Sequence, residues 1–142
     1  MVDAKIKKIL VALDGSKFSF DALSKAIYLA RQCGGAISGL YVVSFYPRNM
    51  GDLIGPIRGR LYDEANKIME RAKLICAQNG IVFKGKIAYG DAKSEIPNFA
   101  KENKYDVIVM GARGLSPIKE MFLGSVSNAV IHKSKVPVLL VK

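Results

Sequence analysis

Apolar and polar positions along the chain form two alternating kinds of segment. Short runs that are continuously apolar and rich in β-branched residues are typical of strands covered on both faces. Between them lie longer stretches whose apolar residues recur at the spacing of a helix. The pattern predicts strands over residues 8–14, 36–43, 82–88, 106–110 and 136–141, and helices over about 18–33, 60–79, 94–103 and 124–133. This alternation predicts an α/β fold, a mostly parallel sheet with helices on both faces.

Capping residues refine two of the predicted helices. Ser16 or Ser19 is available as the N-cap of the first helix, and the glycine at position 34 follows its last apolar residue. In the third helix, Pro97 favours a start after Ser94 rather than after Asp91, since a proline at the third helical position loses no intrahelical N–H bond.

Length and charge narrow the class of protein. The chain has 142 residues, half of them hydrophobic, which predicts one packed domain over residues 1–142 and excludes disordered and fibrous classes. The 22 lysines and arginines exceed the 12 acidic residues, so the net charge is +10 and no acidic residue follows Glu120. This excess favours an anionic partner, whether nucleotide phosphate, nucleic acid or an acidic membrane surface.

Cysteine usage and hydropathy indicate a compartment. Cys33 and Cys76 stand far apart and form no CxxC or metal-ligand cluster, which suits buried thiols in a reducing cytoplasm. No apolar run approaches the roughly 18 residues that a membrane-spanning helix needs, and the first such run ends at Asp14, too early for a signal peptide. We therefore expect a soluble cytoplasmic protein without a membrane partner.

Two connections are longer than a fold of this kind requires. The first runs from Ser44 to Gly59 and contains three glycines and two prolines. Loops of this length are usually either functional, as a lid or an interface, or exposed excursions without a role, and both interpretations stay open here. The second follows the fourth strand and holds the most informative residues.

The second connection carries glycines at positions that suit an anion. Gly111 and Gly114 are followed after nine residues by Gly124, which opens the last helix together with Ser125 and Ser127. Ligands of open parallel sheets bind outside the carboxyl ends of the strands, and free N–H groups at a helix start favour phosphate. Ser125 and Ser127 can add hydroxyl donors. The spacing matches neither a P-loop nor a dinucleotide fingerprint, so a mononucleotide site and an ordinary glycine-rich turn both remain.

At this point the sequence resembles the universal stress protein family, over essentially the whole chain. The resemblance implies an αβα sandwich that is doubly wound, adenine nucleotide alpha hydrolase-like, with five parallel strands in the order 3-2-1-4-5. It also implies membership of the ATP-binding branch, which keeps the glycine pattern. The motifs that carry it are residues 9–16 (Ile-Leu-Val-Ala-Leu-Asp-Gly-Ser), residues 40–43 (Leu-Tyr-Val-Val), the Gly-x2-Gly-x9-Gly-Ser pattern from Gly111 to Ser125, and residues 136–141 (Val-Pro-Val-Leu-Leu-Val).

Position by position, the resemblance implies a set of contacts to ATP. Ala12 and Asp14 would border the nucleoside, with the Asp14 carboxylate toward the ribose or a phosphate-bound Mg²⁺ or Mn²⁺, and the backbone of Val42 would bind adenine. Met110 and Gly111 would flank the ribose. The triphosphate would be enclosed by Gly114, Gly124, Ser125, Val126 and Ser127.

Several charged residues near this site have a second interpretation. Asp14 also fits a turn before the first helix, because Asp-Gly-Ser is ordinary turn chemistry. Arg113 and Lys119 could pair with phosphates or simply lie in solvent. The only histidine, His132, is expected to act as a C-terminal helix cation rather than as a base. Without an acid–base pair, we expect ATP binding with slow hydrolysis at best, and no catalytic residue.

The leading hypothesis is therefore a cytoplasmic ATP-binding stress-response protein that acts as a nucleotide sensor or signalling module. A slow, partner-dependent ATPase is the alternative within the same pocket. A basic nucleic-acid-binding protein is a weaker one, because the lysines match no groove-reading motif. The last strand, from Val136 to Val141, is expected at a sheet edge that needs covering, and the resemblance also implies a homodimer there.

Overall fold

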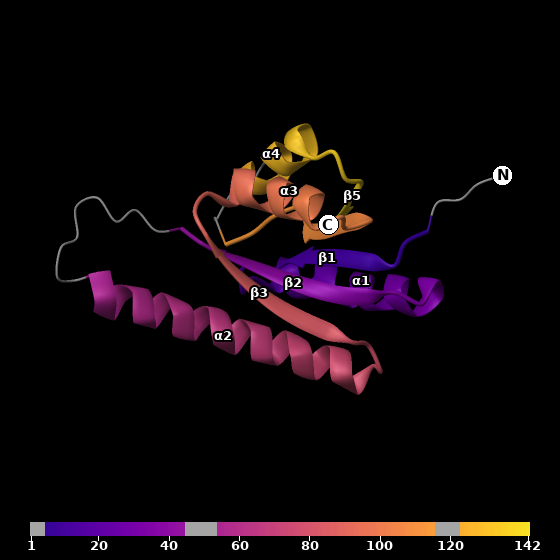
Figure 1. Cartoon of the computed structure of the whole chain (residues 1–142), viewed down its shortest axis with the longest axis horizontal. Helices are drawn as coiled ribbons and strands as arrows, with labels where there is room; N and C mark the ends of the chain where they lie inside the picture. The colour runs from indigo at the N-terminus through magenta and orange to yellow at the C-terminus, as the bar shows by residue number, and fades with distance from the viewer. Residues whose placement is uncertain (1–4, 45–53, 116–122) are drawn as a thin grey trace.

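A computed structural model describes residues 5–44, 54–115 and 123–142, without the side chains of residues 54–56 and 58. Strands and helices alternate through these residues as the pattern predicts (Figure 1). The elements are β1 (Lys8–Ala12), α1 (Lys17–Cys33), β2 (Ala36–Val43), α2 (Ile54–Gln78), β3 (Phe83–Tyr89), α3 (Ala92–Glu102), β4 (Val107–Gly111), α4 (Ser125–Lys133) and β5 (Val138–Val141).

The five strands form one sheet in the order β3-β2-β1-β4-β5, and every pairing is parallel. This confirms the predicted fold class and strand order. The central strand β1 pairs with both neighbours, so Val11 lies between Gly39 of β2 and Val109 of β4. The chain crosses from β3 past β2 and β1 to β4, and strand order therefore reverses beside β1.

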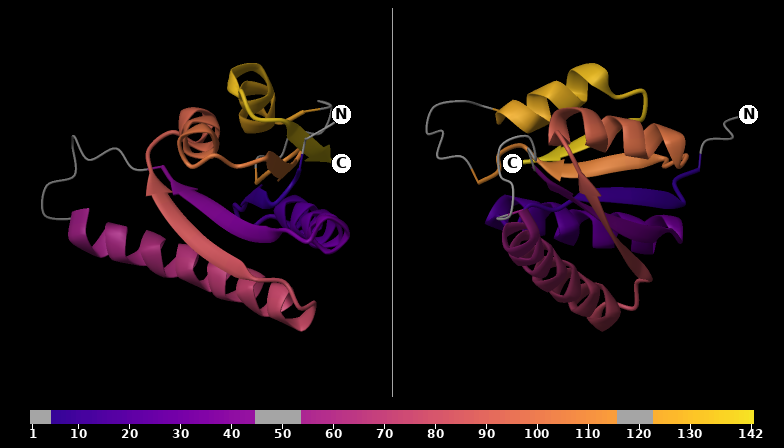
Figure 2. Two further views of the ribbon diagram at one scale, coloured as in Figure 1. Left: turned by 45° about the vertical axis from the view of Figure 1, so that its right-hand side comes forward. Right: turned by 60° about the vertical axis from the view of Figure 1, so that its left-hand side comes forward.

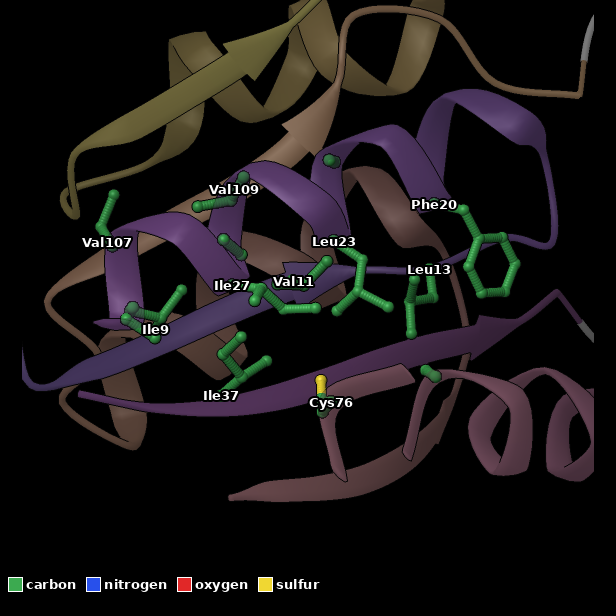
Figure 3. Packing of buried hydrophobic residues seen from close by; sticks show 14 of the residues in the cluster. Ile9, Val11, Leu13, Phe20, Leu23, Ile27, Ile37, Cys76, Val107 and Val109 are labelled. Atoms are coloured by element: carbon green, nitrogen blue, oxygen red, sulfur yellow. The ribbon is translucent and has the colours of Figure 1, made fainter. Parts of the chain in front are cut away.

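The helices form two layers, one on each face of the sheet. Figure 2 shows α1 and α2 on one face and α3 and α4 on the other. The side chains of alternate β1 residues point into the two resulting hydrophobic cores. Ile9 and Val11 pack under α1 and α2 (Figure 3). Leu10 packs under α3 and α4, and all three side chains are fully buried. Each such aliphatic side chain contributes about 1.5–3 kcal/mol of burial free energy, which explains why β1 is continuously apolar.

The helix α2 begins earlier than predicted. It starts at Ile54, so residues 54–59 of the connection from Ser44 to Gly59 are helical and the prediction of a loop there was wrong. Pro56 is its third residue, a position where the missing N–H had no intrahelical partner. Residues 45–53, on which the rest of that prediction falls, lie outside the described residues. Even with the longer α2, no helix in the described ranges combines the length and apolarity of a membrane span.

The start of α3 also differs from the prediction. Asp91, not Ser94, is the N-cap, and its side chain accepts from the N–H of Lys93 at 3.1 Å. Pro97 is consequently the sixth helical residue, where it removes one hydrogen bond to the carbonyl of Lys93. The N-cap bond and the burial of Ile96, 4% exposed, offset that loss.

The start of α1 follows the predicted capping pattern. The Ser16 hydroxyl accepts from the N–H of Ser19 at 3.1 Å, and the helix ends at Gly34 in the left-handed conformation. Between β1 and this cap, Gly15 has a φ of +86°, a conformation that L residues with side chains rarely adopt. The turn fixes the direction in which Asp14 leaves the end of β1.

Candidate functional site

A cavity of about 470 Å³ opens at the carboxyl ends of β1, β2 and β4, beside the point where strand order reverses. The first turn of α4, Ala92 and Ile96 of α3, and Leu61 of α2 also contribute to its wall. All but one of the residues singled out in the sequence line it. These are Ala12, Asp14, Val42, Met110, Gly111, Arg113, Gly114, Gly124, Ser125, Val126 and Ser127. The exception, Lys119, lies outside the described residues.

Asp14 leaves the end of β1 with one carboxylate oxygen used and one open. Its Oδ1 accepts from the N–H of Ser16 at 2.8 Å, so the turn role is real. Its Oδ2 has no hydrogen-bond donor among the described residues. This oxygen lies against the glycine loop, because a Cβ built on Gly114 would come within 2.6 Å of it. Glycine at 114 therefore leaves room for a carboxylate that borders the cavity.

Tyr41 reports on the electrostatics of the same side of the cavity. Burial raises the pKa of its hydroxyl, and the negative charges of Glu64 and Asp14 raise this pKa further. The Glu64 and Asp14 carboxylates therefore both lie close enough to the Tyr41 hydroxyl to act on it.

Gly111 is required by packing within the protein. A Cβ at this position would lie 2.9 Å from the Arg113 carbonyl oxygen and 3.0 Å from the backbone carbon of Phe18. Backbone atoms cannot move aside as a flexible side chain can. The tight turn after β4 therefore requires glycine at position 111 for packing alone, and this glycine also lines the cavity.

The carbonyl of Ala112 ties α4 to the end of β4. It accepts from the N–H of Gly124 at 2.7 Å and from the hydroxyl of Ser127 at 2.7 Å. Ser127 is 2% exposed, and its hydroxyl also contacts the carbonyl of Gly124 at 3.1 Å. The hydroxyl hydrogen of Ser127 therefore braces the backbone, and the expectation that it donates to a phosphate does not hold in this structure. Ser125 is exposed and keeps its hydroxyl at the cavity.

The first turn of α4 presents open N–H groups to the cavity. Gly124 is the N-cap and supplies no side-chain acceptor. The N–H groups of Ser125, Val126 and Ser127 precede the first intrahelical bond, which Asn128 makes to Gly124 at 3.0 Å. No described residue accepts from these three groups. Together with the positive end of the helix dipole, they form a site suited to an anion.

The backbone of Val42 is open on the side of β1. The β1–β2 ladder ends where the N–H of Leu13 donates to the carbonyl of Leu40 at 2.9 Å. Alternate residues of β2 point toward β1, so the N–H and carbonyl of Val42 point into the space beyond its end. Neither group has a partner among the described residues. A donor and an acceptor thus stand side by side at the cavity.

Other candidate groups lie away from the cavity or do not form a cluster. His132 is in the last turn of α4, where a cation interacts favourably with the helix dipole. Asp106 precedes β4, at the other end of the sheet. Among the described residues lining the cavity Asp14 is the only carboxylate, and no three His, Cys, Asp or Glu side chains in the described ranges come together to hold a metal.

Leu61 and Tyr41 are two of the lining residues that were not among the predicted site residues. Leu61 belongs to the apolar stripe of α2 and reaches the cavity only because the helix extends past the end of β2 (Figure 1). Tyr41 precedes Val42, and the alternation of a strand places its side chain on the opposite face. Neither residue carries a local sequence signal, because both depend on where elements end relative to each other.

Known proteins share both the sequence pattern and the fold. Residues 5–142 match the universal stress protein family. The universal stress protein YxiE of Bacillus subtilis is 38% identical over 148 residues, covering 95% of this chain and 98% of that protein. UspA of Lactobacillus plantarum has the same fold, with a TM-score of 0.89, 23% identity and coverage of 99% and 100% of the two chains. A universal stress protein of Archaeoglobus fulgidus, solved in complex with dAMP, has a TM-score of 0.75 and 22% identity, with coverage of 98% and 99%.

Proposed function

The chain belongs to the universal stress protein family, and we propose that it is a stress-response module that binds ATP with Mg²⁺ or Mn²⁺. We further propose that residues 1–142 act as a single nucleotide-binding domain. The observation that carries the proposal is the pair of open backbone groups at Val42, which face the same cavity as the open first turn of α4. The dAMP complex of the Archaeoglobus protein supports the choice of an adenine nucleotide for this fold.

Adenine suits the backbone of Val42 better than guanine does. Adenine presents an amino donor beside a ring-nitrogen acceptor, whereas guanine presents two acceptors at the corresponding edge. The carbonyl and N–H of one residue complement the first arrangement. Against guanine, the carbonyl would face another acceptor, and a buried unpaired acceptor costs about 1–3 kcal/mol. We therefore expect ATP to bind at least about fivefold more tightly than GTP.

The phosphates are proposed to bind at the first turn of α4. The N–H groups of Ser125, Val126 and Ser127 supply donors, and the Ser125 hydroxyl adds one. Arg113 is exposed at the rim and can pair with an outer phosphate. Between base and phosphates, the ribose would lie along the strand ends at Ala12, Met110 and the glycines that follow β4.

A divalent cation fits between Asp14 and the phosphates. Mg²⁺ in nucleotide sites is typically held by one or two carboxylates together with phosphate oxygens and water. Asp14 offers one open oxygen, Oδ2, and the Glu64 carboxylate adds a second negative charge near Tyr41. When bound, the cation supplies charge neutralisation to the phosphates. Asp14 is the residue proposed to hold it.

Little hydrolysis is proposed, with a slow partner-dependent ATPase as the alternative. Asp14 is the only carboxylate lining the described cavity, and a carboxylate on a cation is a poor base for water. A sensor of this kind would signal through occupancy rather than turnover. Phosphate release from ATP, measured with and without cell extract, separates the two.

Calorimetric titration with ATP tests the proposal, with and without Mg²⁺. Gly124→Val adds a side chain at the first turn of α4 without backbone strain, since Gly124 has a φ of −73° and its nearest neighbour would be 3.4 Å away. The matched control is Gly59→Ala, at an exposed helical position where a Cβ meets nothing within 4 Å. We expect one ATP per chain for the wild type and the control, and loss of the signal in Gly124→Val. Absence of binding to the wild type would contradict the proposal.

We also propose a homodimer through the edge strand β5, within residues Val136 to Val141. The support is its edge position together with the exposure of Leu139, 42%, and of Ile131 on the neighbouring α4, 39%. Exposed apolar edge strands need covering. Sedimentation of Leu139→Glu should give a monomer where the wild type gives a dimer. A monomeric wild type would contradict this assignment.

A cytoplasmic location is proposed from the thiols. Both cysteines are free, and burial raises the pKa of the Cys76 thiol to about 11, which keeps it protonated and unreactive at neutral pH. Cys33 is half-buried at the end of α1. Free thiols of this kind are typical of reducing compartments. Fractionation of cells that produce the protein tests the location.

A further inference from the structure

The opposite edge of the sheet presents an open strand. β3 pairs only with β2, and Figure 1 shows it along α2 at the margin of the sheet. The N–H of Ile37 donates to Val82 and the N–H of Gly90 donates to Val43, at 3.0 and 2.9 Å. These bonds set which residues of β3 point toward β2. By alternation, the N–H and carbonyl groups of Phe83, Gly85 and Ile87 point outward.

A groove of about 580 Å³ runs between this open edge and α2. Its helical wall contains the stripe Tyr62, Asn66, Met69 and Lys73, at spacings of four, three and four residues, together with Glu70. On the strand side, Gly85 lets the Met69 side chain pack closely against β3, because a Cβ there would lie 3.1 Å from the sulfur of Met69.

The charges around the groove are mostly positive. Lys84 and Lys86 are exposed on the face of β3 turned away from α2, and Lys73 lies on the helix. Glu70 is the one carboxylate among the described lining residues. A second copy of this chain suits the edge poorly, since antiparallel pairing centred on Gly85 would set Lys84 opposite Lys86, and like charges opposed across strands are destabilising.

We propose that this groove binds an extended acidic segment of a partner protein, added to β3 as a sixth strand. Outward N–H and carbonyl groups of β3 would form the ladder, which gives affinity with little demand on sequence. Side chains on one face of the added strand would meet Lys84 and Lys86 and are expected to be acidic. Those on the other face would meet Tyr62 and Met69 and are expected to be apolar. The proposal does not depend on nucleotide binding.

Fluorescence polarisation with a labelled ten-residue peptide of alternating glutamate and valine tests the proposal. The control peptide has the same composition with the glutamates and valines in two blocks. We expect saturable binding of the alternating peptide and at least tenfold weaker binding of the block peptide. The double substitution Lys84→Glu with Lys86→Glu should weaken binding at least tenfold. Lys25→Glu with Lys101→Glu, an equal charge change on exposed helix positions, should change it less than threefold.

Amide hydrogen exchange with and without the peptide distinguishes strand pairing from simple charge attraction, because charge attraction alone would not slow exchange of the β3 amides. Bound peptide should slow exchange of the N–H groups of Phe83, Gly85 and Ile87. The proposal is overturned if both peptides bind equally, if these amides stay unprotected, or if both double variants weaken binding alike. It is also overturned if the alternating peptide fails to bind while a single-stranded oligonucleotide binds in a manner that Lys84 and Lys86 control, which would mark a nucleic-acid surface.

Discussion

An aspartate lies at each end of the central strand β1, and the two carboxylates are used in opposite ways: Asp106 precedes the neighbouring strand β4, and Asp14 follows β1 itself. At the amino end, Asp106 Oδ2 accepts from the N–H groups of Lys7 and Lys8, both at 2.8 Å. At the carboxyl end, Asp14 accepts one N–H through Oδ1 and leaves Oδ2 open to the cavity. Backbone N–H groups of the protein thus occupy the Asp106 oxygen, whereas Asp14 keeps one oxygen available for a ligand.

The contrast extends beyond the two carboxylates. The hydrogen bonds from the Lys8 and Lys7 backbone, together with the Lys8 charge, hold the pKa of Asp106 below its usual range. The Lys8 ammonium lies 4.6 Å from the centre of the Tyr105 ring. At the carboxyl end, backbone groups of Val42 and of the first turn of α4 have no partner among the described residues. Polar groups that are hydrogen-bonded within the protein support the fold, and those without a partner among the described residues indicate where a ligand is expected.

The largest effect is expected from Gly124→Asp at the carboxyl end. The new carboxylate caps α4, and aspartate and glycine differ at an N-cap by only a few tenths of a kcal/mol, so stability should change by less than about 0.5 kcal/mol. The same charge would occupy and repel the phosphate position. ATP affinity should fall about thirtyfold, equivalent to about 2 kcal/mol. Calorimetry measures the ATP affinity and urea unfolding measures the stability, on one preparation. A variant that binds ATP as tightly as the wild type would contradict the proposed phosphate site at the carboxyl end.

Asp14→Asn should have a smaller effect whose sign depends on Mg²⁺. Asparagine keeps an oxygen for the N–H of Ser16, so the turn and the stability should be retained. With Mg²⁺, we expect ATP affinity to fall about tenfold, or about 1.4 kcal/mol, because the cation loses its carboxylate. Without Mg²⁺, affinity should stay equal or rise, because a negative charge beside the phosphates is gone. Equal losses under both conditions would argue against a metal role for Asp14.

Asp106→Asn is the matched substitution at the amino end. It replaces two charge-assisted hydrogen bonds with neutral ones, which should cost about 1 kcal/mol in the free energy of unfolding. ATP affinity should not change, since Asp106 lies at the far end of the sheet from the cavity. Urea titration and calorimetry check the two halves. A loss of ATP affinity without loss of stability would contradict the structural role of Asp106 and would indicate a ligand site at the amino end.

The smallest expected effect is a pH dependence of the stability that Asp106→Asn loses. Because folding lowers the pKa of Asp106, its stabilisation is fully present above the unfolded pKa, about 3.9, and is lost as pH falls through the lower folded value. The stability difference between wild type and Asp106→Asn should therefore shrink as pH falls below about 4. Unfolding measured at pH 7, 5 and 3 follows this trend. A difference that stays constant down to pH 3 would show that charge is not the cause.

The strands and their order were predictable because buried parallel strands have a strong signal. Uninterrupted apolar runs such as Ile9 to Val11 admit few alternatives, and the resemblance supplied the strand order. The starts of α2 and α3 were not predictable from local rules. Gly55 and Pro56 suggested a loop, yet a proline in the first helical turn costs little. Pro97 suggested a late start, yet the Asp91 cap and buried apolar residues outweighed it.

The site was predictable in its residues more than in their roles. Glycine spacing and resemblance indicated the lining set, but not that Ser127 would point inward to the Ala112 carbonyl. The open backbone of Val42 depends on β1 ending before β2, a relation between two strands that no local pattern contains. Polar side chains can be counted in a sequence. Whether their bonds are already satisfied is decided only by the fold.

Titration of isotope-labelled protein with Mg²⁺-ATP, followed by backbone amide NMR, tests the assignment of the two ends most directly. We predict saturable shifts at Val42 and at Ser125 to Ser127, with slowed hydrogen exchange at Val42, and unchanged amides at Lys7 and Lys8. Shifts confined to the lysine-rich amino end, or none at Val42 and the first turn of α4 on saturation, would contradict the proposed nucleotide site.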